Sequence, residues 1–334
     1  MTHQPGVVYA NTADNLELPV IDVTHPAFAI PDDPNSRATL IEQYKEATAN
    51  DIKGPVFLRR LSMKLGARHS QLLRALIEPS NSFLGGLTTY LMKLGADHLP
   101  DGFNAPLDRR IAGSPHARFI RLRLQHCATM LADGLESLLK TTPGTPLHLI
   151  NIGGGPAIDT LNALILLVQR DRSLLTRPIS IDVCDLDDKG PHFGANALIA
   201  LQNNGAPLSK LDIRFNRHRY DWNKTTPLEQ LLASFEPDAV VVASSEGALF
   251  EYGTDEAIIA NLRALHSRAK LIVGSVTSDQ PIRREQIRTM HFALYPRSVE
   301  GFQPLATQAG YTIDRAEVTP LSDQIALGPQ PLGK

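Results

Sequence analysis

The sequence predicts an α/β protein in which an all-helical N-terminal region precedes a doubly wound, mainly parallel sheet of seven strands. Two observations favour this fold class. After Leu147, apolar runs of strand length alternate with segments of helical periodicity, which is typical of a parallel sheet covered by helices on both faces. Between residues 36 and 140 only helical patterns occur. We therefore expect an arm and helical cap over residues 1–140 and a sheet domain over residues 141–334.

The N-terminal region divides into an arm and a series of helices. Residues 1–35 are rich in Pro, Asp and Asn and show no periodicity, so we expect a loop or an extended arm there. Helical patterns begin near Ser36, with Pro79 and the Gly85–Gly86 pair as breakers. The clearest helix follows Ser114, a residue suited to the N-cap, and has Pro115 in its first turn.

The C-terminal region predicts strands and helices in alternation. The expected strands cover residues 147–153, 179–187, 211–222, 238–245 and 269–277, and the helices between them cover 157–170, 193–204, 227–235 and 255–268. A polar stretch follows, for which no element is predicted. A helix over 298–310 and two closing strands over 311–318 and 324–329 complete the pattern, and we expect a reversed strand in this last part of the sheet.

Composition and charge restrict the class of function. The chain has 334 residues, 43% of them hydrophobic, and a formal net charge of −2, a balance that disfavours nucleic acid as the main partner. The N-terminus lacks a signal-peptide pattern and no apolar run approaches a membrane span, so we expect a soluble, cytoplasmic protein. Cys127 and Cys184 suit neither a disulfide framework nor a zinc site, and no metal site is expected.

Three consecutive glycines, residues 153–155, separate the first expected strand from its helix. A glycine-rich turn at this place lets a ligand approach the backbone and the N–H groups of the helix. The dinucleotide fingerprint G-x-G-x-x-G fails because Ile158 occupies its third glycine position, and no phosphate loop is present. The remaining pattern is G-x-G-x-A, from Gly153 to Ala157.

This stretch resembles motif I of the class I S-adenosylmethionine-dependent methyltransferases, with Asn151 at the usual acidic position and Ala157 at the last glycine. The resemblance implies a Rossmann-like sheet and S-adenosylmethionine as cofactor. It also implies an acid at the end of the second strand that accepts hydrogen bonds from the ribose hydroxyls. Asp185 suits this role, with Asp187 as the alternate. The expected cofactor residues are Asn151, Gly153, Gly154, Gly155, Asp185, Asp221, Trp222 and Ser245, of which Asp221 and Trp222 would meet the adenine.

The acceptor side is expected near the end of the fourth strand. The segments (N/D)PP(Y/F) and Pro-Cys of nucleic-acid methyltransferases are absent there, which disfavours DNA modification. Glu246 follows this strand and is the candidate catalytic base; it could equally stabilise the sulfonium charge or cap the next helix. The candidate acceptor-binding residues are Arg118, Arg121, Glu251, Tyr252 and His291. The two arginines share one face of a helix, where a solvated basic surface is the alternative.

The resulting prediction is a methyltransferase that acts on a small-molecule acceptor, with no nucleic acid or membrane partner. The N-terminal helices would form a lid over the acceptor or the dimerisation surface of a homodimer. Two alternatives remain open at this point. One is an NAD(P)-dependent oxidoreductase, and the other is a non-catalytic S-adenosylmethionine-binding protein.

Overall fold

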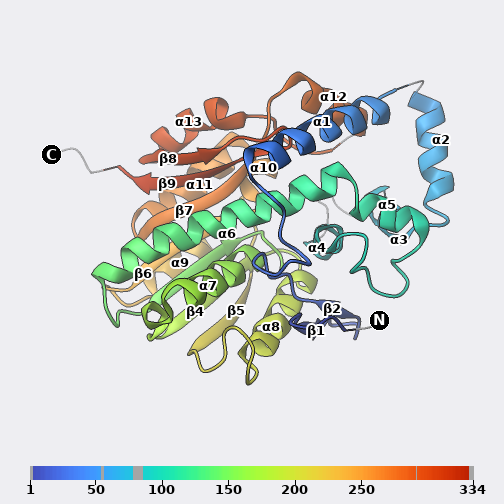
Figure 1. Ribbon diagram of the computed structural model, residues 1–334. Coiled ribbons are helices and arrows are strands. Elements are labelled where there is room, and N and C mark those ends of the chain that lie inside the picture. The colour runs from blue at the N-terminus through green and yellow to red at the C-terminus, as the bar shows by residue number, and fades with distance from the viewer. Residues whose placement is uncertain (1–2, 54–55, 78–85, 291, 331–334) are drawn as a thin grey trace.

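A computed structural model describes residues 3–53, 56–77, 86–290 and 292–330. The N-terminal arm contains a short antiparallel hairpin that the sequence did not predict, formed by β1 (Tyr9–Asn11) and β2 (Glu17–Pro19). The helices that follow gather at one end of the molecule, except for the long α6, which crosses the sheet (Figure 1). They are α1 (Pro34–Asp51), α2 (Val56–Gly66), α3 (Gln71–Ile77), α4 (Gly86–Leu94), α5 (Pro106–Ala112) and α6 (Pro115–Thr141).

The predicted seven-stranded sheet is confirmed. Its strands are β3 (Leu147–Ile152), β4 (Ile179–Asp185), β5 (Ile213–Arg219), β6 (Val240–Ser245), β7 (Ala269–Thr277), β8 (Tyr311–Glu317) and β9 (Ser322–Pro329). Their order in the sheet is β5-β4-β3-β6-β7-β9-β8. The first five strands are parallel, and β9 runs antiparallel to both of its neighbours. This is the reversed strand expected near the end of the chain.

Helices cover both faces of the sheet (Figure 1). One face carries α6, α7 (Ile158–Asp171) and α8 (Lys189–Gln202), and the other carries α9 (Thr226–Ala233), α11 (Asp255–His266) and α13 (Ser298–Gln308). Side chains of β3 alternate between the two resulting cores, since Leu147 and Leu149 belong to one and Ile150 and Ile152 to the other. This alternation follows from the two-residue period of a strand.

Two helices lie outside the predicted pattern. After β6 the chain forms a single turn, α10 (Leu249–Tyr252), and after β7 it forms α12 (Pro281–Met290). No helix was predicted for the segment that forms α12 because its residues are mostly polar. It packs against α1 instead of the sheet, and the Tyr44 hydroxyl of α1 donates to Gln286 Oε1 across a buried contact of 3.2 Å.

The arm does not fold separately from the sheet domain. Val20, Ile21 and Val23 are buried in the same core as Leu147 and Leu149 of β3. Both cysteines are buried free thiols. Over the described ranges, no helix is long and apolar enough to cross a membrane. The predicted boundary at residue 140 therefore separates two stretches of sequence that share one hydrophobic core.

Asn162, on the first turns of α7, holds the arm in place. Its Oδ1 accepts from the backbone N–H of Val23 at 2.7 Å, and its Nδ2 donates to the carbonyl of Ile21 at 2.8 Å. The Asn162 side chain is fully buried. The arm is thereby fastened to the helix that begins at the glycine turn.

We expect Asn162→Ala to lower the free energy of unfolding by about 2 kcal/mol, because it leaves two buried backbone groups of the arm without partners. Urea denaturation measures this change, and limited proteolysis detects release of the arm. Gln169→Ala is the matched control, since Gln169 Nε2 donates to the Thr24 hydroxyl in an exposed contact on the same helix. Equal effects of the two substitutions would contradict this role.

Candidate functional site

The glycine turn lies at the carboxyl edge of the parallel strands, between β3 and α7. Gly153 and Gly155 adopt φ values of +68° and +58°, in the left-handed region that glycine tolerates. Ala157, the N-cap of α7, is also left-handed at φ +53°. A left-handed residue with a Cβ costs roughly 1–2 kcal/mol. The turn is therefore a tightly specified piece of backbone and not a loose connection.

Asn151 supports this turn from inside the protein. Its side chain is fully buried, and its Oδ1 accepts from the N–H of Gly154 at 3.0 Å. Its Nδ2 donates to Asp159 Oδ1 at 2.9 Å and to Ser244 Oγ at 3.0 Å. A Cβ at Gly154 would lie only 2.2 Å from Asn151 Oδ1. Asn151 was predicted to contact the cofactor. In the structure its amide supports the glycine turn, which is the backbone expected to contact the cofactor.

Trp222, which follows β5, packs against the same turn. A Cβ at Gly153 would lie 2.8 Å from the Trp222 ring and 2.8 Å from the Cβ of Ala248. The absence of a side chain at Gly153 therefore lets the segment after β5 and the segment after β6 meet at the turn. Side chains of this protein explain the need for glycine at residues 153 and 154.

Asp185, the last residue of β4, is the carboxylate nearest to the turn. One oxygen accepts from the N–H of Gly155 at 3.0 Å and the other from the N–H of Asp187 at 2.9 Å. Burial raises its pKa, against the effect of these hydrogen bonds. Each carboxylate oxygen can accept a second hydrogen bond. Asp185 therefore keeps the capacity to bind a pair of hydroxyls beside the turn.

Asp221 and Ser245 make internal contacts. The Asp221 carboxylate accepts from the backbone N–H of Asn223 at 3.0 Å and from its Nδ2 at 2.8 Å, and these bonds lower its pKa. The Ser245 hydroxyl is buried, donates to the carbonyl of Ile152 at 3.0 Å and accepts from the N–H of Leu249 at 3.0 Å. Ser245 thus links β6 to the end of β3 and to the start of α10.

Glu246 lies at the centre of a buried ionic network. Its Oε1 is 2.5 Å from Arg123 Nε, and its other oxygen pairs with the Lys93 ammonium. Although burial raises its pKa, the charges of Arg123 and Lys93 lower it by more, so the net shift is downward. An ionised carboxylate with both oxygens in ion pairs is poorly suited to accept a proton. A general base needs a carboxylate oxygen within reach of the proton that it removes, and both oxygens of Glu246 are engaged by cations.

The network continues through Glu251 of α10. Arg123 Nη1 is 3.1 Å from Glu251 Oε1, and the Ser275 hydroxyl of β7 donates to the same oxygen at 2.6 Å. Lys93 and Arg123 come from α4 and α6, whereas Glu246, Glu251 and Ser275 come from the sheet domain. The network therefore joins the helical region to the strand ends by buried charges of opposite sign.

Asp159 of α7 borders this network and contacts Asn151. Burial and the nearby charge of Glu246 raise its pKa to about 6. Its Oδ2 is buried with no hydrogen-bond partner among the described residues. The acid is thus held where its charge is poorly stabilised at neutral pH.

A cavity of about 1000 Å³ lies between the helical region and the segment after β6. Its apolar walls come mainly from the helical region and from the segment after α12, and include Met63, Leu73, Leu107, Ile111, Phe292 and Leu321. Glu251 and Tyr252 line it, as do Arg123 and Gly247. Burial is the main factor that raises the pKa of Tyr252, to about 12. The cavity therefore combines a large volume and apolar walls with polar and charged side chains.

The remaining residues predicted to bind the acceptor are Arg118, Arg121 and His291. The described lining includes neither Arg118 nor Arg121; Arg118 Nη1 donates to Gln43 Oε1 at 2.9 Å on the exposed side of α6. His291 falls outside the described residues. The arginine of α6 that lines the cavity is Arg123, for which no role was predicted from the sequence. It lies four residues after the buried Phe119 and four before the buried Cys127, so its place on the apolar face was the available signal.

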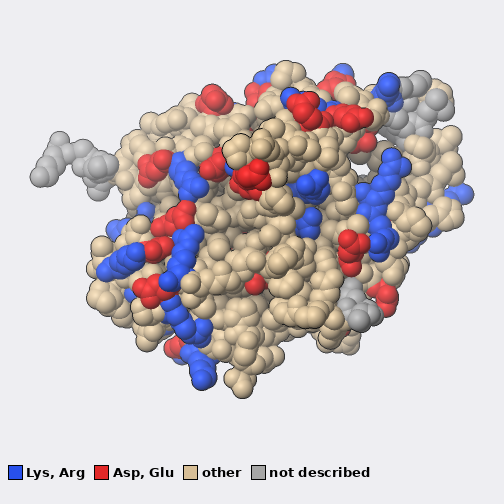
Figure 2. Space-filling model, in the orientation of Figure 1, with Lys and Arg blue, Asp and Glu red and all other residues tan. Residues whose placement is uncertain are grey.

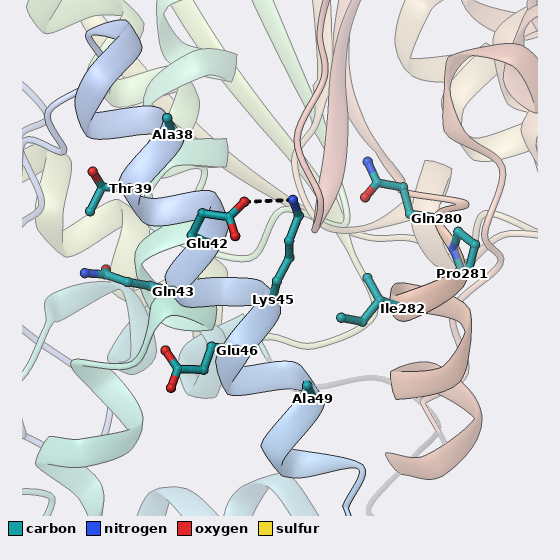
Figure 3. A pocket seen from close by; sticks show the side chains of 10 residues that line it. All are labelled: Ala38, Thr39, Glu42, Gln43, Lys45, Glu46, Ala49, Gln280, Pro281 and Ile282. Atoms are coloured by element: carbon teal, nitrogen blue, oxygen red, sulfur yellow. Dashed lines mark hydrogen bonds and ion pairs between the residues drawn. The ribbon is translucent and has the colours of Figure 1, made fainter.

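A second hollow, of about 1210 Å³, is a surface groove between α1 and the start of α12 (Figure 3). Its polar side chains are those of an exposed helix face, with an ion pair between Glu42 and Lys45. On the face crossed by α6, acidic and basic side chains are interspersed (Figure 2), as where Arg170 and Arg315 both pair with Asp133. Neither feature gathers chemistry comparable to that of the buried cavity.

Comparisons with known proteins give structural neighbours only. No family model and no curated protein matches the chain. Magnesium protoporphyrin IX methyltransferase from Synechocystis PCC 6803, solved with bound S-adenosylmethionine, is similar over 64% of this chain and 84% of its own, with 15% identity and a TM-score of 0.40. The pyocyanin biosynthetic protein PhzM is similar over 67% of this chain and 57% of its own, with 12% identity and a TM-score of 0.38.

A third neighbour is the CMeT domain of the citrinin polyketide synthase, with 18% identity and a TM-score of 0.41. The match covers 69% of this chain and 59% of that domain's chain. This chain thus spans less than two thirds of the length of the second and third neighbours. The bound cofactor named above belongs to the Synechocystis enzyme.

We expect Glu246→Gln to destabilise the protein by about 3–5 kcal/mol, because it removes the negative charge between two buried cations. Urea denaturation measures the loss. Glu136→Gln is the control, since Glu136 pairs with Lys140 at the surface, where ion pairs contribute little. A small effect at Glu246 would mean that the network does not hold the helical region to the sheet.

Asp159→Asn should raise the melting temperature at pH 7.5 and leave it nearly unchanged at pH 4. The pKa of about 6 in the folded state exceeds the ordinary value of 3.8, so wild-type stability falls as the pH rises from about 4 to 6. Asparagine has no such charge. Asp171→Asn, at the other end of α7, should not stabilise at pH 7.5, because hydrogen bonds from Ser173 lower the pKa of Asp171. Thermal melts across this pH range show whether each substitution raises or lowers the melting temperature.

Proposed function

We propose that this protein is an S-adenosylmethionine-dependent methyltransferase that acts on a small-molecule acceptor. The observation that carries the proposal is the adjacency of the glycine turn and the cavity. Ala248 packs against the position of Gly153, and its neighbour Gly247 lines the cavity. A cofactor at the turn and an acceptor in the cavity would therefore meet at the end of β6.

The residues at the strand ends fit this cofactor. Asp185 is half-buried, is oriented by two backbone N–H groups and has acceptor capacity left for the ribose hydroxyls. Asp221 and Trp222 follow the neighbouring strand β5, and the Trp222 ring lies against the turn. We assign the adenine side to these two residues. Asn151 and Ser245 act indirectly in this proposal, because their side chains hold the turn and the strand ends in place.

Bound S-adenosylmethionine supplies an electrophilic methyl group, so the protein needs mainly to position the acceptor and exclude water. The cavity and the helices around it serve that purpose. We assign Glu246 a positioning role, through its ion pairs with Lys93 and Arg123, and no proton transfer. Tyr252, whose pKa burial raises to about 12, is protonated at neutral pH and lines the cavity beside Glu251.

The alternatives are less well supported. A nicotinamide-dependent oxidoreductase would use the third glycine of the dinucleotide fingerprint, and Ile158 occupies that position. A non-catalytic S-adenosylmethionine-binding protein does not account for the cavity that Gly247 and Glu251 line. Transfer of a labelled methyl group to any acceptor distinguishes an enzyme from such a binder.

We expect Asp185→Ala to weaken binding of S-adenosylhomocysteine by roughly ten- to a hundredfold, because it removes hydrogen bonds to a charged group. Isothermal titration calorimetry measures the affinity, with NAD as the competing candidate ligand. Asp187→Ala should have little effect. The Asp187 carboxylate accepts from the N–H of Lys189 at 3.2 Å in an exposed contact, and the bond from the Asp187 N–H to Asp185 does not involve its side chain.

The outcomes separate the possible errors. Binding of NAD without binding of S-adenosylhomocysteine would contradict the proposed cofactor. A larger effect of Asp187→Ala than of Asp185→Ala would move the ribose contact to Asp187. Asp185→Asn adds a check on folding, because an amide oxygen can still accept the hydrogen bond from Gly155.

A further inference from the structure

Arg283 of α12 is a buried cation without a carboxylate partner. The residue is 6% exposed and lines the cavity. Its Nη1 donates to Gln286 Oε1 at 2.5 Å, and its Nε is buried with no hydrogen-bond partner among the described residues. No described carboxylate lies within ion-pair distance of it. Arg123, in the same cavity, is paired with both Glu246 and Glu251.

The side chains around Arg283 make no ion pair with it. Asp51 also lines the cavity, but its carboxylate lies 3.8 Å from His116 Nε2 and outside ion-pair distance of Arg283. Tyr44 and Tyr252 are close enough for its charge to oppose the burial that raises their pKa, so both phenols are neutral at neutral pH. The pKa of His116 is lowered to about 4 by burial and by the charge of Arg283, so this ring is also neutral. Glu251 already binds Arg123 and Ser275.

A buried, unpaired guanidinium is costly to a folded protein. Such a cost is offset when a ligand brings the missing negative charge and a planar set of acceptors. The cavity also has apolar walls, to which side chains such as Leu107 and Phe292 contribute. The ligand must therefore combine one anionic group with an apolar body.

We propose that the acceptor is an apolar carboxylic acid whose carboxylate binds Arg283. One unpaired guanidinium balances one negative charge, which favours a carboxylate over a phosphate ester. Arg283 is then a specificity-determining residue, and the apolar walls receive the carbon skeleton. The identification of the bound acid as the acceptor rests on the proposed methyltransferase function, whereas the anion site stands on the geometry of Arg283 alone.

Three probes that share a naphthalene ring with a one-carbon polar substituent test the site: 2-naphthoate, 2-naphthylmethanol and 2-naphthylmethylammonium. Calorimetry at pH 7.5 should give at least about tenfold tighter binding for the naphthoate than for the alcohol, and the weakest binding for the ammonium. Arg283→Gln should reduce the preference for naphthoate to within about threefold. Arg284→Gln is the matched control, because Arg284 is the next residue, is exposed and pairs with Asp279. It should leave the preference unchanged.

Two results would overturn the proposal: no preference for naphthoate in the wild-type protein, or a preference that survives Arg283→Gln. Tighter binding of 2-naphthyl phosphate than of naphthoate would replace the carboxylate by a phosphate ester. Circular dichroism checks the fold of each variant, and Arg283→Lys, which keeps the charge, should retain part of the preference. Binding of S-adenosylhomocysteine is measured in parallel. Its absence would refute the cofactor while the naphthoate test still reports on Arg283.

Discussion

The buried network of Lys93, Arg123, Glu246 and Glu251 is the interaction on which the candidate site depends. Two cations from the helical region meet two carboxylates that follow β6. Neither pair of charges would be stable in the interior without the other, so these four side chains can be buried only when the helical region is docked on the sheet. The cavity exists only in that docked state, because its walls come from both sides of the network.

The glycine turn likewise depends on contacts from a few side chains. Its form depends on Asn151 below it and on Trp222 against it, so the protein shapes the turn before any ligand arrives. A preformed site loses less conformational entropy on binding than a flexible loop would. The resemblance to motif I implies that Asn151 and Trp222 contact the ligand. They can also act indirectly, by holding the backbone that would make that contact.

The sheet could be predicted because strand spacing and side-chain alternation are local properties of a sequence. Boundaries of β3, β4 and β7 follow directly from apolar runs between glycines and polar turns. By contrast, α12 has a polar surface and depends on a partner helix more than 200 residues away, as the contact between Tyr44 and Gln286 illustrates, at a separation of 242 residues. The choice of arginine in α6 also depends on distant contacts. Spacing along the helix pointed to Arg118 and Arg121, whereas the arginine on the apolar face is Arg123.

The cavity is built from segments that lie far apart in the chain. The apolar walls of the cavity come largely from the N-terminal helices, but the unpaired cation Arg283 comes from α12, which follows β7. Because α12 packs on α1, any movement of the helical region would shift Arg283 together with those walls. The charge that selects the ligand and the surface that encloses it are therefore mechanically linked. An anion that binds Arg283 would stabilise the docked arrangement in which the end of β6 is covered.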